Sequence, residues 1–366
     1  KLITDKDIVG YGEIYSVPFH PNIVSKMIDD VFDRYVKNKD PFKIEKLWRT
    51  IYSSGYTQRP DISLMGIISG IEMACWDIVG KELGKPIYEL LGGQVHNKLR
   101  SYTYLYPEKK DKSDVYTDAK LAAERTNEYI EKGFTAVKFD PVGSYTPLDP
   151  RNLTLEDLIR VEHFVKTIHD SVKNKCDLLI GTHGQMTTAS AIRLAKRLEK
   201  FDPMWFEEPV PPENFEEMGR VSLSTTIPVA TGERLATKYE FSKILQSQGA
   251  SVLQMNLGRV GGILEAKKIA GLAETHYAQI APHLYCGPVV GAANIQISTC
   301  SPNFLILEGV KNWEDFYSEI IIDPIEWKNG YVIPSKKPGL GIELNEKVAE
   351  KNTYTGSKLH LEMGEI

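Results

Sequence analysis

Eight short apolar segments recur along residues 101–309, and most are separated by a stretch in which apolar residues lie three and four positions apart. Short apolar runs are typical of buried strands, and the spacing of three and four is typical of helices. The apolar segments are 101–106, 135–140, 177–182, 204–208, 228–233, 251–256, 278–283 and 304–309. The helical segments include 117–132, 155–173, 188–199, 238–247 and 262–275. This repetition predicts an α/β fold whose parallel strands close into a (β/α)8 barrel of the TIM type.

A doubly wound open sheet is the competing architecture for the same alternation. The segment GRVGG at 258–262 has the glycine content of a dinucleotide-binding loop. It lacks the GxGxxG spacing, however, and no acidic residue follows at the end of the next predicted strand. We therefore favour the barrel.

The residues before the barrel predict a smaller N-terminal domain. Helical patterns there span 22–37, 43–55 and 64–83, and the last of them stops at Gly84. The first fourteen residues read as a hairpin without its opening strand, so we expect further residues to precede Lys1. The domains that we predict are an α+β domain over 1–98, the barrel over 99–323, and a C-terminal segment over 324–366 that returns to the N-terminal domain.

Composition and charge exclude several classes of protein. The chain has 366 residues and a net charge of −5 without a long run of Lys or Arg, so we expect no nucleic-acid partner. No apolar stretch reaches the roughly 18 residues that span a bilayer, and the N-terminus lacks a secretory signal pattern, so we expect a cytoplasmic protein without a membrane partner. The four cysteines show no CxxC spacing, which argues against a disulfide framework or a zinc site.

Polar residues end seven consecutive predicted strands. They are Lys138 and Asp140 on the second strand, Thr182 and His183 on the third, Glu207 and Glu208 on the fourth, Glu233 on the fifth, Asn256 on the sixth, His283 on the seventh and Glu308 on the eighth. One such residue would be read as a solvated loop charge, but independent surface charges have no reason to share one end of a barrel. The C-terminal ends of the strands carry the active site in (β/α)8 enzymes, so we predict the active site there.

These residues suggest metal-assisted proton transfer. Glu207 and Glu233 lie on neighbouring strands, and carboxylate oxygens on adjacent strands are the ligands that Mg²⁺ prefers. His183 and His283 can give or take protons near neutral pH.

Several long motifs resemble the enolase superfamily, specifically the mandelate racemase and muconate lactonizing enzyme family and its galactonate- and gluconate-type dehydratases. In order, the motifs are GIEMACWDIVGKELGKPIYELLGG, AVKFDP, FEEPVPPEN, IPVATGERL, GRVGGILEAKKIA and IAPHLYCGP. The resemblance implies an N-terminal capping domain over the barrel mouth, a Mg²⁺ cofactor, and removal of the proton α to a substrate carboxylate to give an enediolate held by the metal. The α-proton of a carboxylate is too weakly acidic for histidine alone, which is why a dication is needed.

The resemblance also assigns roles to individual residues. Glu207 and Glu233 match two metal ligands of the family, and Lys138 matches a lysine that contacts the substrate carboxylate. His283 matches the catalytic base. His183 matches the general acid that protonates the departing hydroxyl.

Two positions depart from the family pattern. The family's third metal ligand is an aspartate at the position of Gly181, which has no side chain to offer, so we predict Asp140 on the adjacent strand as the third ligand, with His183 as the rival. Asn256 stands where the family has an aspartate that orients the catalytic histidine. We expect the asparagine oxygen to accept the imidazole N–H of His283 without supplying the charge that raises its pKa.

The function that we predict is a Mg²⁺-dependent dehydratase of a sugar acid, an aldonate or an aldarate, that gives a 2-keto-3-deoxy acid. The alternatives are a racemase, epimerase or cycloisomerase acting through the same enediolate, and a non-catalytic sugar-acid-binding barrel. We predict that Arg234, Glu308 and Gln185 bind the substrate. The partner is then a small-molecule sugar acid, and the family resemblance implies a homo-oligomer.

Overall fold

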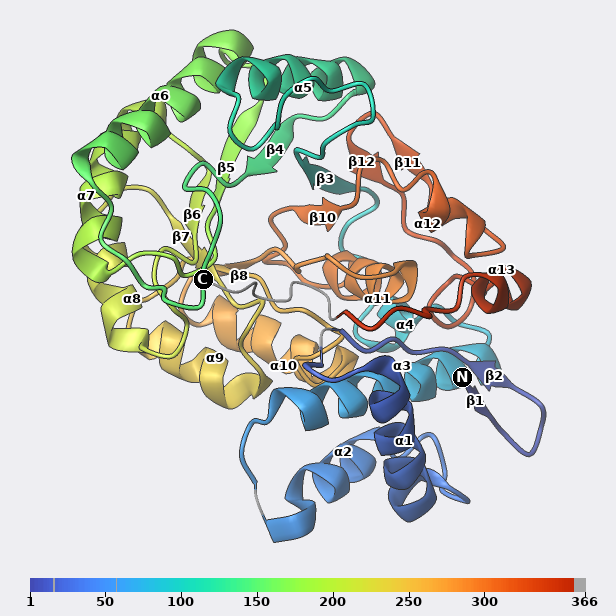
Figure 1. Ribbon diagram of the computed structural model, residues 1–366. Coiled ribbons are helices and arrows are strands. Elements are labelled where there is room, and N and C mark those ends of the chain that lie inside the picture. The colour runs from blue at the N-terminus through green and yellow to red at the C-terminus, as the bar shows by residue number, and fades with distance from the viewer. Residues whose placement is uncertain (16, 57, 359–366) are drawn as a thin grey trace.

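The computed structural model describes residues 1–15, 17–56 and 58–358, and its centre is a parallel barrel (Figure 1). The barrel strands are β3 (Leu99–Tyr104), β4 (Ala136–Phe139), β5 (Asp177–Gly181), β6 (Trp205–Glu207), β7 (Val229–Thr231), β8 (Val252–Leu253), β9 (Gln279–Ile280) and β10 (Leu307–Gly309). Neighbours pair in parallel from β3 to β9, and β10 pairs in parallel with β3. A bridge between Ile280 and Phe304 closes the ring. Each predicted apolar segment overlaps one of these strands, and all but the first contain the whole strand, which confirms the barrel.

Helices surround these strands on the outside (Figure 1). They are α5 (Ala119–Lys132), α6 (Leu155–Val172), α7 (Thr188–Leu198) with the 3₁₀ turn η3 (Glu199–Phe201), α8 (Phe215–Ser222), α9 (Thr237–Gln246), α10 (Ile263–Glu274) and α11 (Pro288–Thr299). The five helical segments predicted from apolar spacing are confirmed. Every residue of α11 is buried, so this helix has no polar face and its sequence carries no amphipathic pattern.

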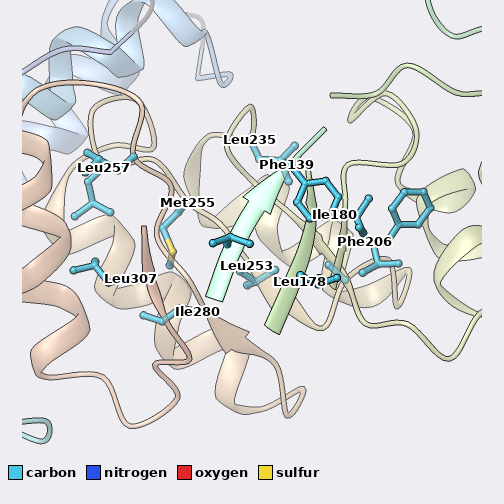
Figure 2. Close-up of a cluster of buried hydrophobic side chains, with 14 of the residues drawn as sticks. Phe139, Leu178, Ile180, Phe206, Leu235, Leu253, Met255, Leu257, Ile280 and Leu307 are labelled. Carbon is cyan, nitrogen blue, oxygen red and sulfur yellow. The ribbon is translucent and has the colours of Figure 1, made fainter. Parts of the chain in front are cut away.

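Side chains alternate between the inside and the outside of the barrel. The inner layer consists of Tyr102, Ala136, Leu179, Trp205, Ala230, Val252, Ala281 and Ile306. The neighbours Leu178 and Ile180 belong instead to the larger core between strands and helices, as do Phe206 and Leu253 (Figure 2). Because successive side chains of a strand point to opposite faces, the position two residues beyond each inner-layer residue also points inward.

The N-terminal domain packs a long buried helix against shorter elements. Its elements are β1 (Leu2–Ile3), β2 (Val9–Gly10), α1 (Pro21–Val31) with the π-helical turn η1 (Phe32–Val36), α2 (Ile44–Ser53) with the 3₁₀ turn η2 (Ser54–Tyr56), α3 (Ile62–Glu82) and α4 (Ile87–Leu90). Among the described residues, α3 is the one helix with the length and hydropathy of a membrane span, and 78% of its apolar window is buried inside the protein. We therefore interpret α3 as the core helix of this domain.

The buried Glu72 and the half-buried Glu13 tie the N-terminal domain to the barrel. Glu72 of α3 accepts hydrogen bonds from the backbone N–H groups of Ile263 (2.7 Å) and Leu264 (2.9 Å). Glu13 accepts from the N–H groups of Gly287 and Val290 in the same way. Both carboxylates satisfy the free N–H groups at the start of a barrel helix, α10 and α11 respectively.

The C-terminal segment contacts both parts of the molecule. It contains α12 (Phe316–Glu319), β11 (Trp327–Lys328), β12 (Tyr331–Val332) and α13 (Glu346–Lys351). The β11–β12 hairpin extends the barrel sheet, because β12 pairs antiparallel with β3. The chain then reaches the N-terminal domain, where the N–H of Leu340 donates to Asp77 (2.8 Å) and the hydroxyl of Tyr11 donates to Glu346 (2.7 Å).

Candidate active site

A layer of polar side chains lies directly above the inner apolar layer of the barrel. Each of these side chains comes two residues after an inner-layer residue: Lys138 after Ala136, Glu207 after Trp205, His283 after Ala281, and Glu308 after Ile306. Together with Asp140, His183, Glu208, Glu233 and Asn256, which follow the same strands, they form what we call the polar rim. The strand period of two thus aims the four side chains that lie two residues after the inner layer into the barrel mouth.

Lys138 lies at the centre of a buried charge cluster. Its ammonium is 2.6 Å from Oε1 of Glu308 and 3.1 Å from Oε1 of Glu207. Burial alone would lower the pKa of Lys138, but the two carboxylates outweigh it and hold the pKa well above its usual value. Lys138 is therefore an ammonium ion at the rim.

Gly181 provides the space through which the Lys138 side chain passes. A Cβ atom at position 181 would lie 2.9 Å from Cγ and 3.0 Å from Cδ of Lys138. An aspartate at position 181, as in the family pattern, would displace the aliphatic part of the Lys138 side chain. The position of Lys138 therefore depends on the glycine.

Asp140 and His183 form a pair on one side of the rim. Oδ2 of Asp140 is 3.2 Å from Nδ1 of His183, and Oδ1 accepts a hydrogen bond from the N–H of Val142 (2.8 Å). The ring of Tyr145 lies 5.1 Å from the His183 ring. Burial lowers the pKa of His183, but the hydrogen bond to Asp140 and the charges of Glu233 and Asp140 outweigh it and raise the pKa to about 9.

His283 lies across the rim, between Glu233 and Asn256. Its Nε2 is 3.0 Å from Oε2 of Glu233, and its Nδ1 is 2.9 Å from Nδ2 of Asn256. The expectation that the asparagine oxygen accepts from His283 is wrong. That oxygen accepts the N–H of Gly258 instead (2.8 Å), so the amide nitrogen faces the histidine.

The three predicted substrate-binding residues all have partners within the protein. Gln185 accepts the N–H of His183 (3.2 Å) and donates to the carbonyl of Gly143. Glu308 accepts the N–H of Leu284 (2.8 Å) in addition to its pairing with Lys138. Arg234 pairs with the buried carboxylate of Glu208 at 2.6 Å. Their roles toward substrate remain predictions.

Sequence reasoning missed Tyr15 and Arg259 at the rim, and it listed Glu208 among the strand-end residues without assigning it a role. Tyr15 of the N-terminal domain lies with its ring 5.6 Å from the His283 ring, and the guanidinium of Arg259 lies 4.7 Å from the centre of the Tyr15 ring. Glu208 anchors Arg234, and the doublet of glutamates at 207–208 was a signal that both act at the site. No local signal marks Tyr15, because it reaches the rim from a distant part of the chain.

The donor set of the rim fits a divalent cation in part. Carboxylates outnumber the Lys and Arg side chains, with Asp140, Glu207, Glu208, Glu233 and Glu308 against Lys138, Arg234 and Arg259. Glu207 and Glu233 end adjacent strands, and Mg²⁺ often uses one or two carboxylates with water or substrate completing its shell. Within residues 1–15, 17–56 and 58–358, no group of three His, Cys, Asp or Glu side chains is arranged to hold a metal. Asp140 as third ligand therefore stays a prediction.

Family models match both parts of the chain. The model for the N-terminal domain of mandelate racemase and muconate lactonizing enzyme matches residues 1–92, and the enolase C-terminal domain-like model matches residues 121–348. The chain belongs to the mandelate racemase and muconate lactonizing enzyme family. This confirms the resemblance to the enolase superfamily drawn from the sequence motifs, and the N-terminal domain is the family's capping domain.

Curated relatives in this family include sugar-acid enzymes. A D-gluconate/D-galactonate dehydratase from Picrophilus torridus is 33% identical over 360 residues, which cover 97% of this chain and 88% of the relative. A D-galactonate dehydratase from Xanthomonas campestris is 32% identical over 366 residues, which cover 96% of this chain and 89% of the relative.

Solved structures of family members share the whole fold. A mandelate racemase/muconate lactonizing enzyme homologue from Labrenzia alexandrii is 60% identical with a TM-score of 0.97, over 100% of this chain and 93% of that one. A homologue from Burkholderia is 59% identical with a TM-score of 0.98, over 100% of this chain and 91% of that one.

Proposed function

We propose that this family member is a hydro-lyase that removes water from a sugar acid, an aldonate or an aldarate. The observation that carries the proposal is the placement of two histidines on opposite sides of a carboxylate-rich rim, with His183 following β5 and His283 following β9. The names of the curated relatives, which are gluconate and galactonate dehydratases, support the same reaction class.

The reaction needs two proton transfers at neighbouring carbons. A basic group of the enzyme takes the proton α to the carboxylate, the electron pair of that C–H bond forms a double bond to the β-carbon, and the β-hydroxyl leaves as water with a proton from the enzyme. The resulting enol then takes up a proton at the former β-carbon to give a 2-keto-3-deoxy acid. Each transfer requires a protein group within about 3 Å, or one water, of its atom.

Glu207 and Glu233 would hold Mg²⁺ at the rim, with Asp140 as the proposed third ligand. When bound, the ion supplies positive charge that stabilises the negative charge developing on the substrate carboxylate. Lys138 adds a fixed positive charge to the same buried region, since Glu207 and Glu308 keep it protonated.

His183 is suited to protonate the departing hydroxyl. A pKa raised to about 9 by Asp140 and the neighbouring carboxylates keeps its ring protonated at neutral pH. The ring is also partly exposed at the barrel mouth, with its side chain 25% accessible, so a substrate can reach it.

The test is a panel of six-carbon aldonates and aldarates incubated with the protein and Mg²⁺, with detection of the keto product by a carbonyl reagent. We expect one or a few acids to give a 2-keto-3-deoxy product, and Glu233→Gln to abolish it. Lys337→Met changes an exposed ion pair with Asp323 and serves as the control that should keep activity. An isomerised acid without keto product would favour the racemase, epimerase or cycloisomerase alternative, and binding without any conversion would favour the sugar-acid-binding barrel.

A further inference from the structure

Three contacts determine which way the amide of Asn256 points. Its Oδ1 lies 2.8 Å from the backbone N–H of Gly258, which can only donate a hydrogen bond. Its Nδ2 lies 2.9 Å from Nδ1 of His283 and 3.8 Å from the sulfur of Cys286. Turning the amide over would place its NH2 group against the N–H of Gly258, and two donors would then face each other in a buried position. The oxygen therefore faces Gly258 and the NH2 group faces His283.

The amide orientation decides which nitrogen of His283 carries the proton. An NH2 group has no acceptor, so Nδ1 of His283 must accept and must be unprotonated. The proton of the neutral ring is then on Nε2, which lies 3.0 Å from an oxygen of Glu233 that can accept it. We infer that Asn256 is a positioning residue that holds His283 as its Nε2–H tautomer, so that His283 presents a hydrogen-bond donor to the rim instead of a basic lone pair.

The other rim histidine has the reverse arrangement. Oδ2 of Asp140 lies 3.2 Å from Nδ1 of His183, and a carboxylate can only accept from that nitrogen. An aspartate at position 256 would act on His283 in the same way, because its two oxygens could accept from both Gly258 N–H and His283 Nδ1–H. Asparagine in place of aspartate therefore has two effects. It removes a negative charge, and it moves the proton of the His283 ring from Nδ1 to Nε2.

This arrangement limits what His283 can do in the reaction. Nε2 already carries a proton, so His283 can take the α-proton only after the Asn256 amide turns over and loses its bond to Gly258. As found, His283 can donate to a substrate oxygen. That donor role rests on the proposed lyase function, whereas the tautomer depends only on contacts within the protein.

The experiment is nitrogen NMR of the full chain labelled with ¹⁵N in histidine, without substrate. Protonated and unprotonated ring nitrogens resonate in well-separated regions, and coupling to the ring protons distinguishes Nδ1 from Nε2. We expect the His283 ring to show unprotonated Nδ1 and protonated Nε2, with its signals assigned by their loss in His283→Asn. His96 is an internal reference for this tautomer, because its Nε2 lies 3.0 Å from the carbonyl oxygen of Ser301.

The matched variant is Asn256→Asp, which keeps the size and shape of the side chain. We expect its unprotonated signal to move from Nδ1 to Nε2 of His283, while the His96 signals stay in place. A protonated Nδ1 on His283 in the unmodified protein would overturn the inference, whether or not Asn256→Asp folds. No substrate is present in the NMR experiment, so a failure of the lyase assay would not change its result. A failure of the tautomer inference would likewise leave the lyase proposal standing.

Discussion

The ammonium of Lys138 lies 2.6 Å from a carboxylate oxygen of Glu308, and the two side chains are only 4% and 5% exposed. Glu207 completes the cluster at 3.1 Å. Removing one partner of a buried ion pair leaves the others charged without compensation, which is costly. We expect Lys138→Met to lower the free energy of unfolding by roughly 3–5 kcal/mol in urea denaturation. The exposed pair of Lys337 and Asp323 supplies the control, because Lys337→Met should cost less than about 1 kcal/mol. Equal losses in the two variants would contradict the pairing.

Any side chain at position 181 is expected to clash with Lys138 and to lower the stability of the protein. Gly181→Ala places a methyl group 2.9 Å from Cγ of Lys138, so we expect a loss of roughly 1–3 kcal/mol in the same assay. Gly271→Ala is the matched control, because a Cβ there meets open space and alanine favours the helix. A Gly181→Ala variant as stable as Gly271→Ala would show that the lysine stem lies elsewhere.

Metal binding is expected to depend on Glu207, Glu233 and Asp140. Mg²⁺ that binds only the folded protein raises its melting temperature, so the shift with added Mg²⁺ measures the site. We expect Glu207→Gln and Glu233→Gln to abolish the shift and Asp140→Asn to weaken binding at least about tenfold, since each removes a charged oxygen ligand. Asp170→Asn alters an exposed carboxylate and should leave the shift unchanged. A normal shift in Asp140→Asn would point to His183 as the third ligand.

Glu72 is expected to make stability fall as pH rises. Burial raises the pKa of Glu72 from 4.5 to about 8, although the N–H groups of Leu264 and Ile263 act in the opposite direction. A carboxyl whose pKa is higher in the folded state binds its proton more tightly there, so its contribution to stability is lost between about pH 4.5 and pH 8. Glu72→Gln should remove this part of the slope in unfolding measurements across that range. Glu274→Gln changes an exposed residue at the other end of α10, and it should keep the slope.

His183 is expected to be needed for water loss but not for α-proton removal. With an acid that the unmodified protein converts, His183→Asn should form at least about a hundredfold less keto product, the contribution typical of a general acid. The α-proton should still exchange in D₂O, because that step needs no donor for the hydroxyl. The exposed His276 provides the control, and His276→Asn should retain both reactions. Full product formation by His183→Asn would remove it from the mechanism.

Local patterns in the sequence were enough to predict the barrel and the position of its active end. Short apolar runs and the helical spacing are properties of neighbouring residues, so segments such as 177–182 and 155–173 could be recognised without any long-range contact. The polar residues that end the strands could be recognised for the same reason, since parallel strands bring their carboxyl ends to one side. The family motifs extended this to an N-terminal capping domain, and the family models confirm its identity.

Contacts between distant residues decided how the site is arranged. The sequence shows that Gly181 stands where the family has a metal ligand. Only the packing shows that the Lys138 side chain runs through the space that the glycine leaves free. The sequence shows that Asn256 replaces a charged aspartate of the family pattern. The orientation of its amide, however, depends on the N–H of Gly258, a backbone group whose direction cannot be read from a pattern of side chains. Tyr15 reaches His283 from another domain. Residue types and strand ends are therefore determined locally, whereas hydrogen-bond direction and ion pairing depend on which distant groups the folded chain brings within about 3 Å.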